Sequence, residues 1–430
     1  MRKLFWFLCL LSTPLFAAPP VQHWQTEAGA PVYFVATPGL PMLDVRLVWA
    51  AGSARDGAQP GVAAMTSALL GSGTAEKDAT AIAAGFEGLG ARFASGAERD
   101  SAWLHLRTLT LPEQQKGAVD LLLEVLREPV FRDEEVALAR SQMLTGLRAR
   151  KQNIDAVARD AFTRAVFAGH PYGRLAGAED IEALTRSAAE AFYRQYYAAA
   201  NAVIVLVGDI SAAQARALAG QLSAVLPQGR KAAPLPPVAP LQEARTVRID
   251  FPSAQTAVLL GQPSLSRSDP RRLPLMLANH GFGGNGFASV LMDEVREQRG
   301  LVYSIYSYVA PMSEAGPFVI GFKTRNDQAQ EALALVREKL SDYIRTGPSE
   351  AAFQDSIDNI TGGAPMRTDT NIELAQALAA IGFYHLPADS LDTYPARVRA
   401  VTRAQALAAF AEVLAPEKMV TVIVGKDAQN

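Results

Sequence analysis

Alternating apolar and polar positions predict strands near the start of the chain. Residues 32–37 (VYFVAT) and 42–52 (MLDVRLVWAAG) have the short, β-branched pattern of strands, and residues 91–109 return to it. The longer segments between them repeat their apolar residues at helical spacing. Strands and helices mixed in this order predict an α+β fold, in which antiparallel or mixed sheets are backed by helices.

Two distant stretches of the chain resemble each other. Residues 184–209 combine a helical pattern with NAVIVLVGD, and residues 401–427 repeat that order with KMVTVIVGKD. Thr185 and Thr402 lie 217 residues apart and are both placed as helix N-caps. We therefore predict two tandem homologous domains.

A proline-rich stretch separates the two copies. Residues 226–244 contain five prolines, which exclude a regular helix or a central strand. The predicted organisation is an N-terminal domain at 22–225, a linker at 226–244 and a C-terminal domain at 245–430.

Residues 1–18 have the three-part pattern of a secretory signal peptide. Arg2 and Lys3 precede an apolar run, and small residues follow at Ala17 and Ala18. The alternative, a membrane anchor, needs about 20 apolar residues, which this run does not reach. The one cysteine, Cys9, lies inside the run, so the mature chain would have no disulfide. We expect export, to the periplasm rather than to a disulfide-rich extracellular setting, and no transmembrane segment in the mature chain.

Composition narrows the classes of function. The 430 residues include 41 basic and 43 acidic side chains, for a formal net charge of −2, and 49% are apolar. This composition is typical of folded domains, and the absence of a basic cluster argues against nucleic acid as a partner. The five histidines are widely separated, and no HExxH, HxxEH or GxSxG motif occurs. Local spacing therefore assigns neither a metal site nor a nucleophile.

The segment from residue 281 to 311 combines glycines, charges and aromatic residues. GFGGNGF at 281–287 lacks the GK[ST] ending of a phosphate-binding loop, so we predict a flexible loop at a helix end. A charged helical segment then ends near Gly300, a predicted C-cap, before an aromatic strand. Alternation places Tyr306 and Tyr308 on one face of that strand and Tyr303 on the other. From this pattern alone, Arg296 is a solvated helix residue and Tyr303 a sheet residue.

Four segments resemble the pitrilysin or insulinase-type zinc peptidases, especially the two-subunit branch that includes mitochondrial processing peptidase. They are GVAAMTSALLGSGT at 61–74, GHPYGRLAGAEDIEALT at 169–185, NAVIVLVGD at 201–209 and GFGGNGFASVLMDEVREQRGLVYS at 281–304. The resemblance extends from about Trp24 to Val424. It implies two homologous α+β domains per subunit, and two subunits that close around a chamber for unfolded or extended peptides.

The catalytic motif of that family is replaced in this chain. Active members carry HxxEH in the first segment, where two histidines bind zinc and the glutamate activates water. The same positions here hold Ala64, Ser67 and Ala68. The family's third ligand, a glutamate, is expected within residues 139–148, which contain no carboxylate. By resemblance, the chain has no catalytic residue and no metal of its own, and zinc is expected in a partner subunit.

Another element of the family is retained. In active complexes an arginine and a tyrosine seven residues apart hold the substrate beside the zinc, and Arg296 and Tyr303 have that spacing. The resemblance assigns Arg296 a charge-assisted hydrogen bond to a peptide carbonyl, and Tyr303 a hydroxyl contact to the oxyanion. A sheet edge within residues 91–103 is expected to bind extended peptide by strand addition. Phe93 stands there in place of a small polar residue, which puts this edge in question.

One main hypothesis follows, with two alternatives. The chain is a non-catalytic, substrate-binding subunit of a heteromeric zinc metalloendopeptidase, inactive alone and active with a homologous partner that carries HxxEH. The first alternative is a purely structural scaffold subunit of a periplasmic or membrane-associated assembly, against which the retained Arg296 and Tyr303 argue. The second is a stand-alone hydrolase, which the missing nucleophile and base motifs disfavour.

Overall fold

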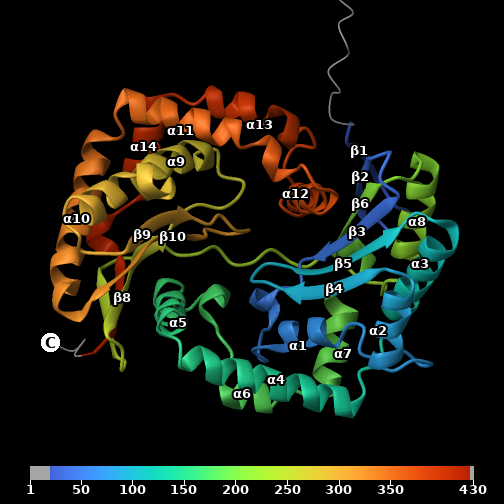
Figure 1. Cartoon of the computed structure of the whole chain (residues 1–430). Coiled ribbons are helices and arrows are strands. Elements are labelled where there is room, and N and C mark those ends of the chain that lie inside the picture. The colour runs from blue at the N-terminus through green and yellow to red at the C-terminus, as the bar shows by residue number, and fades with distance from the viewer. Residues whose placement is uncertain (1–19, 427–430) are drawn as a thin grey trace, which may run out of the picture.

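The structure of the chain, a computed structural model, describes residues 20–426. The predicted signal peptide at 1–18 lies outside these residues. Two α+β halves face each other, each built around one mixed sheet (Figure 1). The predicted fold class, tandem α+β domains with helix-backed sheets, is confirmed.

The first half contains a six-stranded sheet in the order β1-β2-β6-β3-β5-β4, in which β2 and β6 are parallel and all other neighbours antiparallel. The strands are β1 (Gln22–Gln25), β2 (Pro31–Ala36), β3 (Met42–Trp49), β4 (Arg92–Ala97), β5 (Ala102–Leu109) and β6 (Ala202–Gly208). The helices are α1 (Val62–Leu69), α2 (Ala79–Gly88), α3 (Pro112–Arg127), α4 (Asp133–Lys151), α5 (Ile154–Val166), α6 (Ala178–Glu182), α7 (Arg186–Tyr196) and α8 (Ala212–Val225).

The second half contains a five-stranded sheet in the order β7-β11-β8-β10-β9, in which β7 and β11 are the parallel pair. The strands are β7 (Arg245–Asp250), β8 (Gln255–Pro263), β9 (Ser304–Val309), β10 (Pro317–Arg325) and β11 (Val420–Gly425). The helices are α9 (Arg272–Asn279), α10 (Ala329–Thr346), α11 (Glu350–Gly362), α12 (Asn371–Phe383), α13 (Ser390–Arg399) and α14 (Arg403–Val413).

The internal repeat is visible in the caps and in the strand order. Thr185 accepts a hydrogen bond from the N–H of Ala188 at the start of α7, and Thr402 accepts one from the N–H of Gln405 at the start of α14, each at 3.2 Å. Both predicted N-caps are confirmed. The strands that follow occupy equivalent places, because β6 lies between β2 and β3 while β11 lies between β7 and β8.

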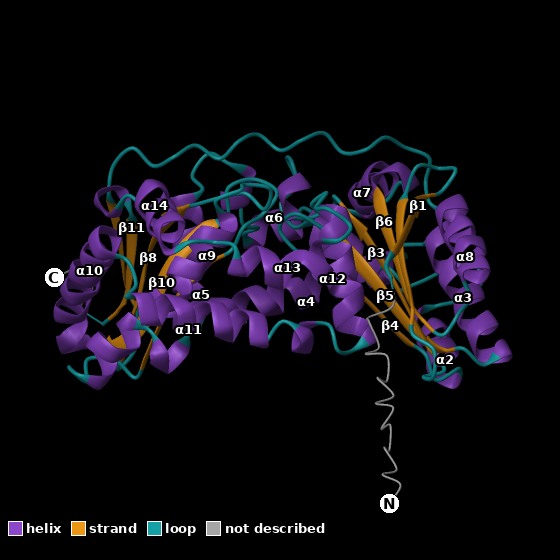
Figure 2. Cartoon of the chain, turned by 90° about the horizontal axis from the view of Figure 1, so that it is seen from above, coloured by secondary structure: helices purple, strands orange, loops and turns teal. Residues whose placement is uncertain are grey.

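Residues 226–244 contain no helix or strand. They pass along one side of the molecule from the first sheet to the second (Figure 2). Of residues 20–426, no helix combines the length and the apolar character that crossing a bilayer requires.

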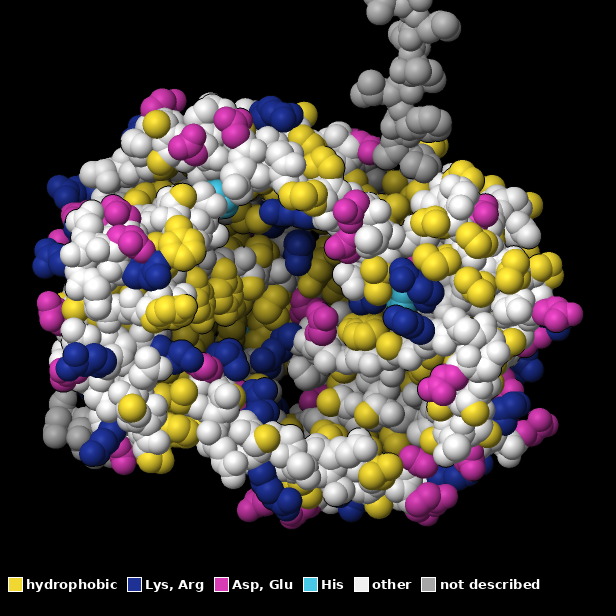
Figure 3. All heavy atoms as spheres, viewed as in Figure 1, with side chains coloured by type: hydrophobic (Ala, Val, Ile, Leu, Met, Phe, Trp, Pro, Cys, Tyr) yellow, Lys and Arg dark blue, Asp and Glu magenta, His cyan; other side chains and the backbone are white. Residues whose placement is uncertain are grey.

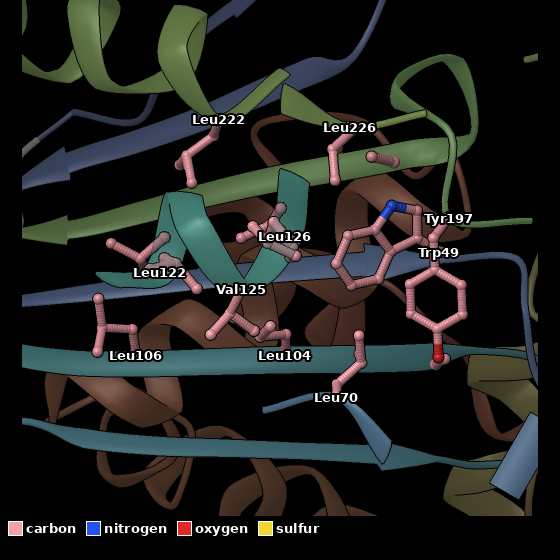
Figure 4. Packing of buried hydrophobic residues seen from close by; sticks show 14 of the residues in the cluster. Trp49, Leu70, Leu104, Leu106, Leu122, Val125, Leu126, Tyr197, Leu222 and Leu226 are labelled. Atoms are coloured by element: carbon pink, nitrogen blue, oxygen red, sulfur yellow. The ribbon is translucent and has the colours of Figure 1, made fainter. Parts of the chain in front are cut away.

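The main core of the first half lies between its sheet and α3, α7 and α8. Strand alternation sends Leu104 and Leu106 of β5 to this face, where they meet Leu122 and Val125 of α3 (Figure 4). At one end of the core Trp49 packs against Tyr197, with ring centroids 4.8 Å apart. Burial of this apolar surface is the main term that holds the helices to the sheet.

On the sheet face opposite its own main core, each half is packed against a helix of the other half. From α5 in the first half, Ala158 and Phe162 pack on Leu259 and Val422 of the second sheet. From α12 in the second half, Leu378 packs on the valines of β6 in the first sheet. The contact of α12 is close, because a Cβ at Gly382 would lie 2.5 Å from a methyl group of Val203. Each sheet is thus covered by a helix from the other half, which fixes the halves relative to each other.

Candidate functional site

Helix α1 carries the three positions at which the resemblance places the zinc motif. Ala64 and Ala68 lie one turn apart on its exposed side, and Ser67 is buried. Methyl groups cannot bind a metal, and a serine hydroxyl is not a base at neutral pH. On the other side of the helix, Met65 and Leu69 pack into the core of the first half. The helix therefore keeps its packing and lacks the donor atoms for zinc at these positions.

Helix α4 lies beside α1, where the third ligand of the family is expected. Met143 of α4 lies against Gly61 at the start of α1, and residues 139–148 offer no carboxylate. Over residues 20–426, no group of three or more histidine, cysteine, aspartate or glutamate side chains is placed to hold a metal ion. The region thus lacks the ligand set of a catalytic zinc site.

Arg296 and Tyr303 are brought together in the second half, beside a third residue, Phe287. The Arg296 Cζ atom lies 5.6 Å from the ring centroid of Tyr303 and 4.8 Å from that of Phe287. One guanidinium nitrogen of Arg296 also donates to Glu297 Oε1 at 2.7 Å. Tyr303 is 83% exposed and Phe287 is 73% exposed. An arginine held between two accessible rings is a surface that can bind a peptide through both charge and aromatic contact.

A tight turn creates this arrangement. Residues Met292–Glu297 form a π-helical turn, after which Gly300 adopts a left-handed conformation with φ +62°. The N–H of Gly300 donates to the carbonyl of Arg296 at 2.9 Å, and that of Leu301 to the carbonyl of Val295 at 3.1 Å. The helix ends near Gly300 as predicted, but its C-cap is Gln298, two residues earlier, and Gly300 provides the left-handed residue of the turn that follows. Because the turn reverses the chain, residue 303 comes beside residue 296.

The prediction for the aromatic strand was correct in part. Tyr306 and Tyr308 of β9 share a face, with stacked rings whose centroids are 6.0 Å apart. Tyr303, expected on the opposite face of the strand, instead precedes β9, which begins at Ser304. Because it makes no pair in the sheet, its side chain is free of cross-strand packing, and this explains its exposure.

The glycine-rich segment 281–287 is not the flexible loop that we expected. Residues His280–Gly284 continue α9 as a π-helical turn, with Phe282 buried. Gly283 approaches β9 so closely that an added Cβ would collide with Ser307 Oγ. The expectation was wrong because Gly281 and Gly283 serve close packing rather than flexibility. The prediction from sequence also missed Phe287, for which the signal was a large apolar side chain inside a glycine-rich segment.

A cavity of about 280 Å³ lies next to Tyr303, between α5 and the second sheet. Its lining includes Tyr306 and an ion pair across the two halves, in which Lys323 Nζ lies 2.9 Å from Asp155 Oδ2. Burial raises the pKa of the Tyr306 hydroxyl, so it stays protonated at neutral pH. Figure 3 shows that the molecule is hollowed between its halves, with apolar and basic side chains on the walls. Tyr303 thus lies at a recess that an extended chain could enter.

The first sheet ends at β4, which pairs with β5 and with no other strand of the described chain. Phe93 was expected to disturb peptide binding at this edge. Its side chain instead turns toward α2, where it stacks on Phe86 at a centroid distance of 5.0 Å. Ala94, the next residue, is exposed. Phe93 therefore does not cover this edge, and peptide binding by strand addition stays a prediction.

Family models match most of the chain. The model of the insulinase family (peptidase family M16) matches residues 33–178, and that of the peptidase M16 inactive domain matches residues 183–360. The crystal structure of a peptidase M16 inactive domain from Pseudomonas fluorescens is 39% identical, with a TM-score of 0.91. The match covers 94% of this chain and 98% of that chain.

Two curated relatives are more distant in sequence. An uncharacterized zinc protease of Streptomyces coelicolor is 26% identical over 370 residues, covering 83% of this chain and 78% of the relative. The non-peptidase homolog YmxG of Helicobacter pylori is 25% identical over 351 residues, covering 80% of each chain. One relative is named a protease and the other a non-peptidase homolog, so the names do not assign an activity to this chain. Its role has to be inferred from the residues of the site.

Proposed function

The chain belongs to peptidase family M16 as an inactive member, and on that premise we propose that it is the substrate-binding subunit of a heteromeric zinc metalloendopeptidase. The observation that carries this proposal is the contrast between two places in the fold. By resemblance, the positions of the zinc motif hold Ala64, Ser67 and Ala68, whereas Arg296 and Tyr303 lie together, Arg296 partly exposed and Tyr303 largely exposed. A homologous partner with HxxEH supplies the zinc and its water.

The two retained side chains have different tasks in this proposal. Arg296 donates a charge-assisted hydrogen bond to a carbonyl of the extended peptide, which strengthens binding in the ground state. Tyr303 donates its hydroxyl to the oxygen that becomes negative when the partner's zinc-bound water attacks. The aromatic ring of Phe287 supports Arg296 through the cation–π contact at 4.8 Å.

We also propose that the chain is exported and works in the periplasm. The support is the three-part pattern of residues 1–18. The N-terminal sequence of the chain recovered from the periplasmic fraction tests this, and an uncleaved N-terminus on cytoplasmic protein would contradict it.

The decisive experiment uses a complex reconstituted from this chain and an HxxEH-bearing homologue of the same organism. In that complex Tyr303→Phe should lower turnover by roughly 10²- to 10³-fold with little change in KM, because an oxyanion contact strengthens in the transition state. Arg296→Ala should lower turnover and also raise KM, because it removes a ground-state bond to the peptide. Arg299→Ala, an exposed arginine three residues away, is the matched control and should leave both constants unchanged.

Zinc content and subunit assembly are measured on the same samples. Both should equal those of the unmodified complex, since the metal belongs to the partner. Unchanged turnover in both variants would overturn the proposal and favour the structural scaffold. If the two chains never associate, the heteromeric enzyme is excluded.

A further inference from the structure

A second cavity lies on the first sheet, away from Arg296 and Tyr303. Its volume is about 420 Å³, and it is bounded by β3, β4, β5 and α12. The polar and aromatic side chains that matter here are Arg46, Glu98, Trp103, His105, Arg267 and Tyr384. These six residues belong neither to the positions of the zinc motif nor to the site proposed around Tyr303, so their grouping has no explanation so far.

Two arginines are held in this cavity by aromatic rings. The Arg46 Cζ atom lies 4.7 Å from the ring centroid of Trp103, and the Arg267 Cζ atom lies 4.5 Å from that of Tyr384. Trp103 is itself fixed, because its indole lies so flat on Gly96 that an added Cβ would be 2.6 Å from the ring. The rings orient the guanidinium groups, and the Tyr384 hydroxyl also interacts with Arg267.

The donors of the two arginines are incompletely used. The Nε atoms of Arg46 and Arg267 are buried and have no hydrogen-bond partner within residues 20–426. A buried donor without an acceptor is unfavourable, because it has lost its hydrogen bond to water without gaining another. Burial also lowers the pKa of Arg46, an effect that the Glu98 carboxylate opposes. An anion in the cavity would remove both penalties.

The resident acidic groups do not neutralise this cavity. Asp44, beneath it, is fully buried and already binds His105 Nε2 at 2.8 Å and the Arg107 guanidinium at 2.9 and 3.1 Å. Glu98 is the one carboxylate among the residues that line the cavity, and it is exposed. Asp100, whose carboxylate accepts from the Tyr384 hydroxyl, lies outside the lining, is buried and is also bound to Tyr172 and Ser313. Among the residues that line the cavity, two arginines face one exposed glutamate, so the lining itself carries one excess positive charge.

The cavity also borders the open sheet edge. Ala94 of β4 lines it, and Ala94 pairs with His105 of β5. The neighbouring residue, Ser95, points to the opposite face, where its hydroxyl donates to the carbonyl of Ser67 in α1 at 2.8 Å. A peptide strand added to β4 would alternate in the same way. Every second side chain of that peptide would face α1, and the others would face the arginine cavity.

From this geometry we infer that the cavity of Arg46 and Arg267 receives an acidic side chain of the extended peptide bound along β4. The inference rests on the proposed peptide-binding function and adds the class of substrate, a peptide with an aspartate or glutamate at a position that faces the cavity. Guanidinium groups match the planar carboxylate and bind it through paired donors. Neutral side chains at that position would leave the two Nε donors without an acceptor.

The test uses two flexible peptides with capped ends and a neutral fluorescent label, identical except for a central glutamate or glutamine. Fluorescence anisotropy with the full mature chain should give at least about tenfold tighter binding for the glutamate peptide, the value of one charge-assisted hydrogen bond. Arg46→Met keeps an unbranched stem over Trp103 and should bring the two affinities within about twofold, as should Arg267→Met. Arg92→Met, on the same face of β4 but outside the cavity, is the matched control and should keep the preference.

Each other outcome is decisive. Equal affinity of the unmodified chain for the two peptides would overturn the inference and leave the proposed function standing, whereas no binding of either peptide would overturn both. If Arg92→Met also abolished the preference for the glutamate peptide, that preference would come from the overall positive charge of the surface and not from the cavity, and the inference would be overturned. Glutarate, a free dicarboxylate, should compete only weakly with the glutamate peptide. If glutarate binding depends on Arg46 while the chain shows no preference between the two peptides, the inference is overturned and the cavity is a site for small anions. Arg296→Ala should weaken both peptides and keep their ratio, because Arg296 lies outside this cavity.

Discussion

Removal of the Asp100 carboxylate should destabilise the whole molecule, because this side chain joins the two halves. Asp100 lies in the turn between β4 and β5 and is only 5% exposed. It accepts hydrogen bonds from the hydroxyl of Tyr172 in the first half at 2.5 Å, and from two groups of the second half. These are the N–H of Ser313 at 2.7 Å and the hydroxyl of Tyr384 at 3.2 Å. The perturbation that we propose is Asp100→Ala.

The expected loss of unfolding free energy comes from the hydrogen-bond donors that Asp100→Ala leaves without an acceptor. Tyr172 is fully buried, and burial together with the Asp100 charge raises the pKa of both Tyr172 and Tyr384, so both hydroxyls stay protonated as donors. A buried donor left without its acceptor costs about 1–3 kcal/mol, which applies in full to Tyr172 and in part to the half-buried Tyr384, whereas Ser313 is exposed and water can replace the carboxylate there. The three bonds are coupled through one carboxylate. Relief of the carboxylate's own desolvation offsets part of this sum. The net loss should be about 2–4 kcal/mol.

Urea unfolding followed by circular dichroism measures the loss, and amide hydrogen exchange locates it. The N–H groups of Ser313 and Glu314 bind Asp100 and the Tyr172 hydroxyl, so their protection should fall in the variant. Asp120→Ala is the matched control, because its exposed pair with Lys116 should contribute less than about 1 kcal/mol. A loss of under about 1 kcal/mol, or unchanged protection at Ser313, would refute the role of Asp100 as the link between the halves.

Two further predictions concern metal and pH. The purified chain should retain no stoichiometric zinc after dialysis, which elemental analysis checks, and one tightly held zinc per unmodified chain would contradict this. The triple change Ala64→His, Ser67→Glu and Ala68→His should still give no activity in a peptide cleavage assay. The reason is that a catalytic zinc needs a third protein ligand, which residues 139–148 do not offer. Burial raises the pKa of Asp56 from 3.8 to about 6. The folded chain therefore binds this proton more tightly than the unfolded chain, so the stability due to Asp56 is present at low pH and is lost as the pH rises from about 4 to about 6, by about 3 kcal/mol at most. Asp56→Asn should flatten that part of the curve of unfolding free energy against pH, and an unchanged slope would contradict the assignment.

The features that sequence predicts best here are those that neighbouring residues decide. Thr185 and Thr402 cap their helices through a bond to a residue three positions away, and Gly300 reverses the chain after a helix through bonds within its own turn. Such bonds depend on local chemistry, which the sequence contains in full. The positions at which the resemblance places the zinc motif are a prediction of the same local kind, since the two histidines and the glutamate of HxxEH lie within five consecutive residues.

The features that sequence could not supply depend on partners far along the chain. The apolar face of α5 indicates that it is buried, but Phe162 gives no sign that it packs on the second sheet rather than the first. Arg46 and Arg267 are 221 residues apart and have the pattern of ordinary charged positions. The three donors that meet Asp100 come from three separate segments. Periodicity indicates which face of a helix or strand is buried, but it does not identify the element that packs against that face.

The arrangement of α1 explains how chemistry can be lost here while the architecture is kept. Ala64 and Ala68, at which the resemblance places two metal ligands, are exposed, so the packing of the helix does not depend on which side chain they carry. Met65 and Leu69 on the opposite side hold the helix to the sheet, and truncation of such buried side chains costs about 2–5 kcal/mol. Selection for a stable fold therefore acts on one side of the helix and selection for catalysis on the other. In the proposed role, in which a partner supplies the zinc, the second set can be lost while α1 still accepts the hydrogen bond from Ser95 that positions β4.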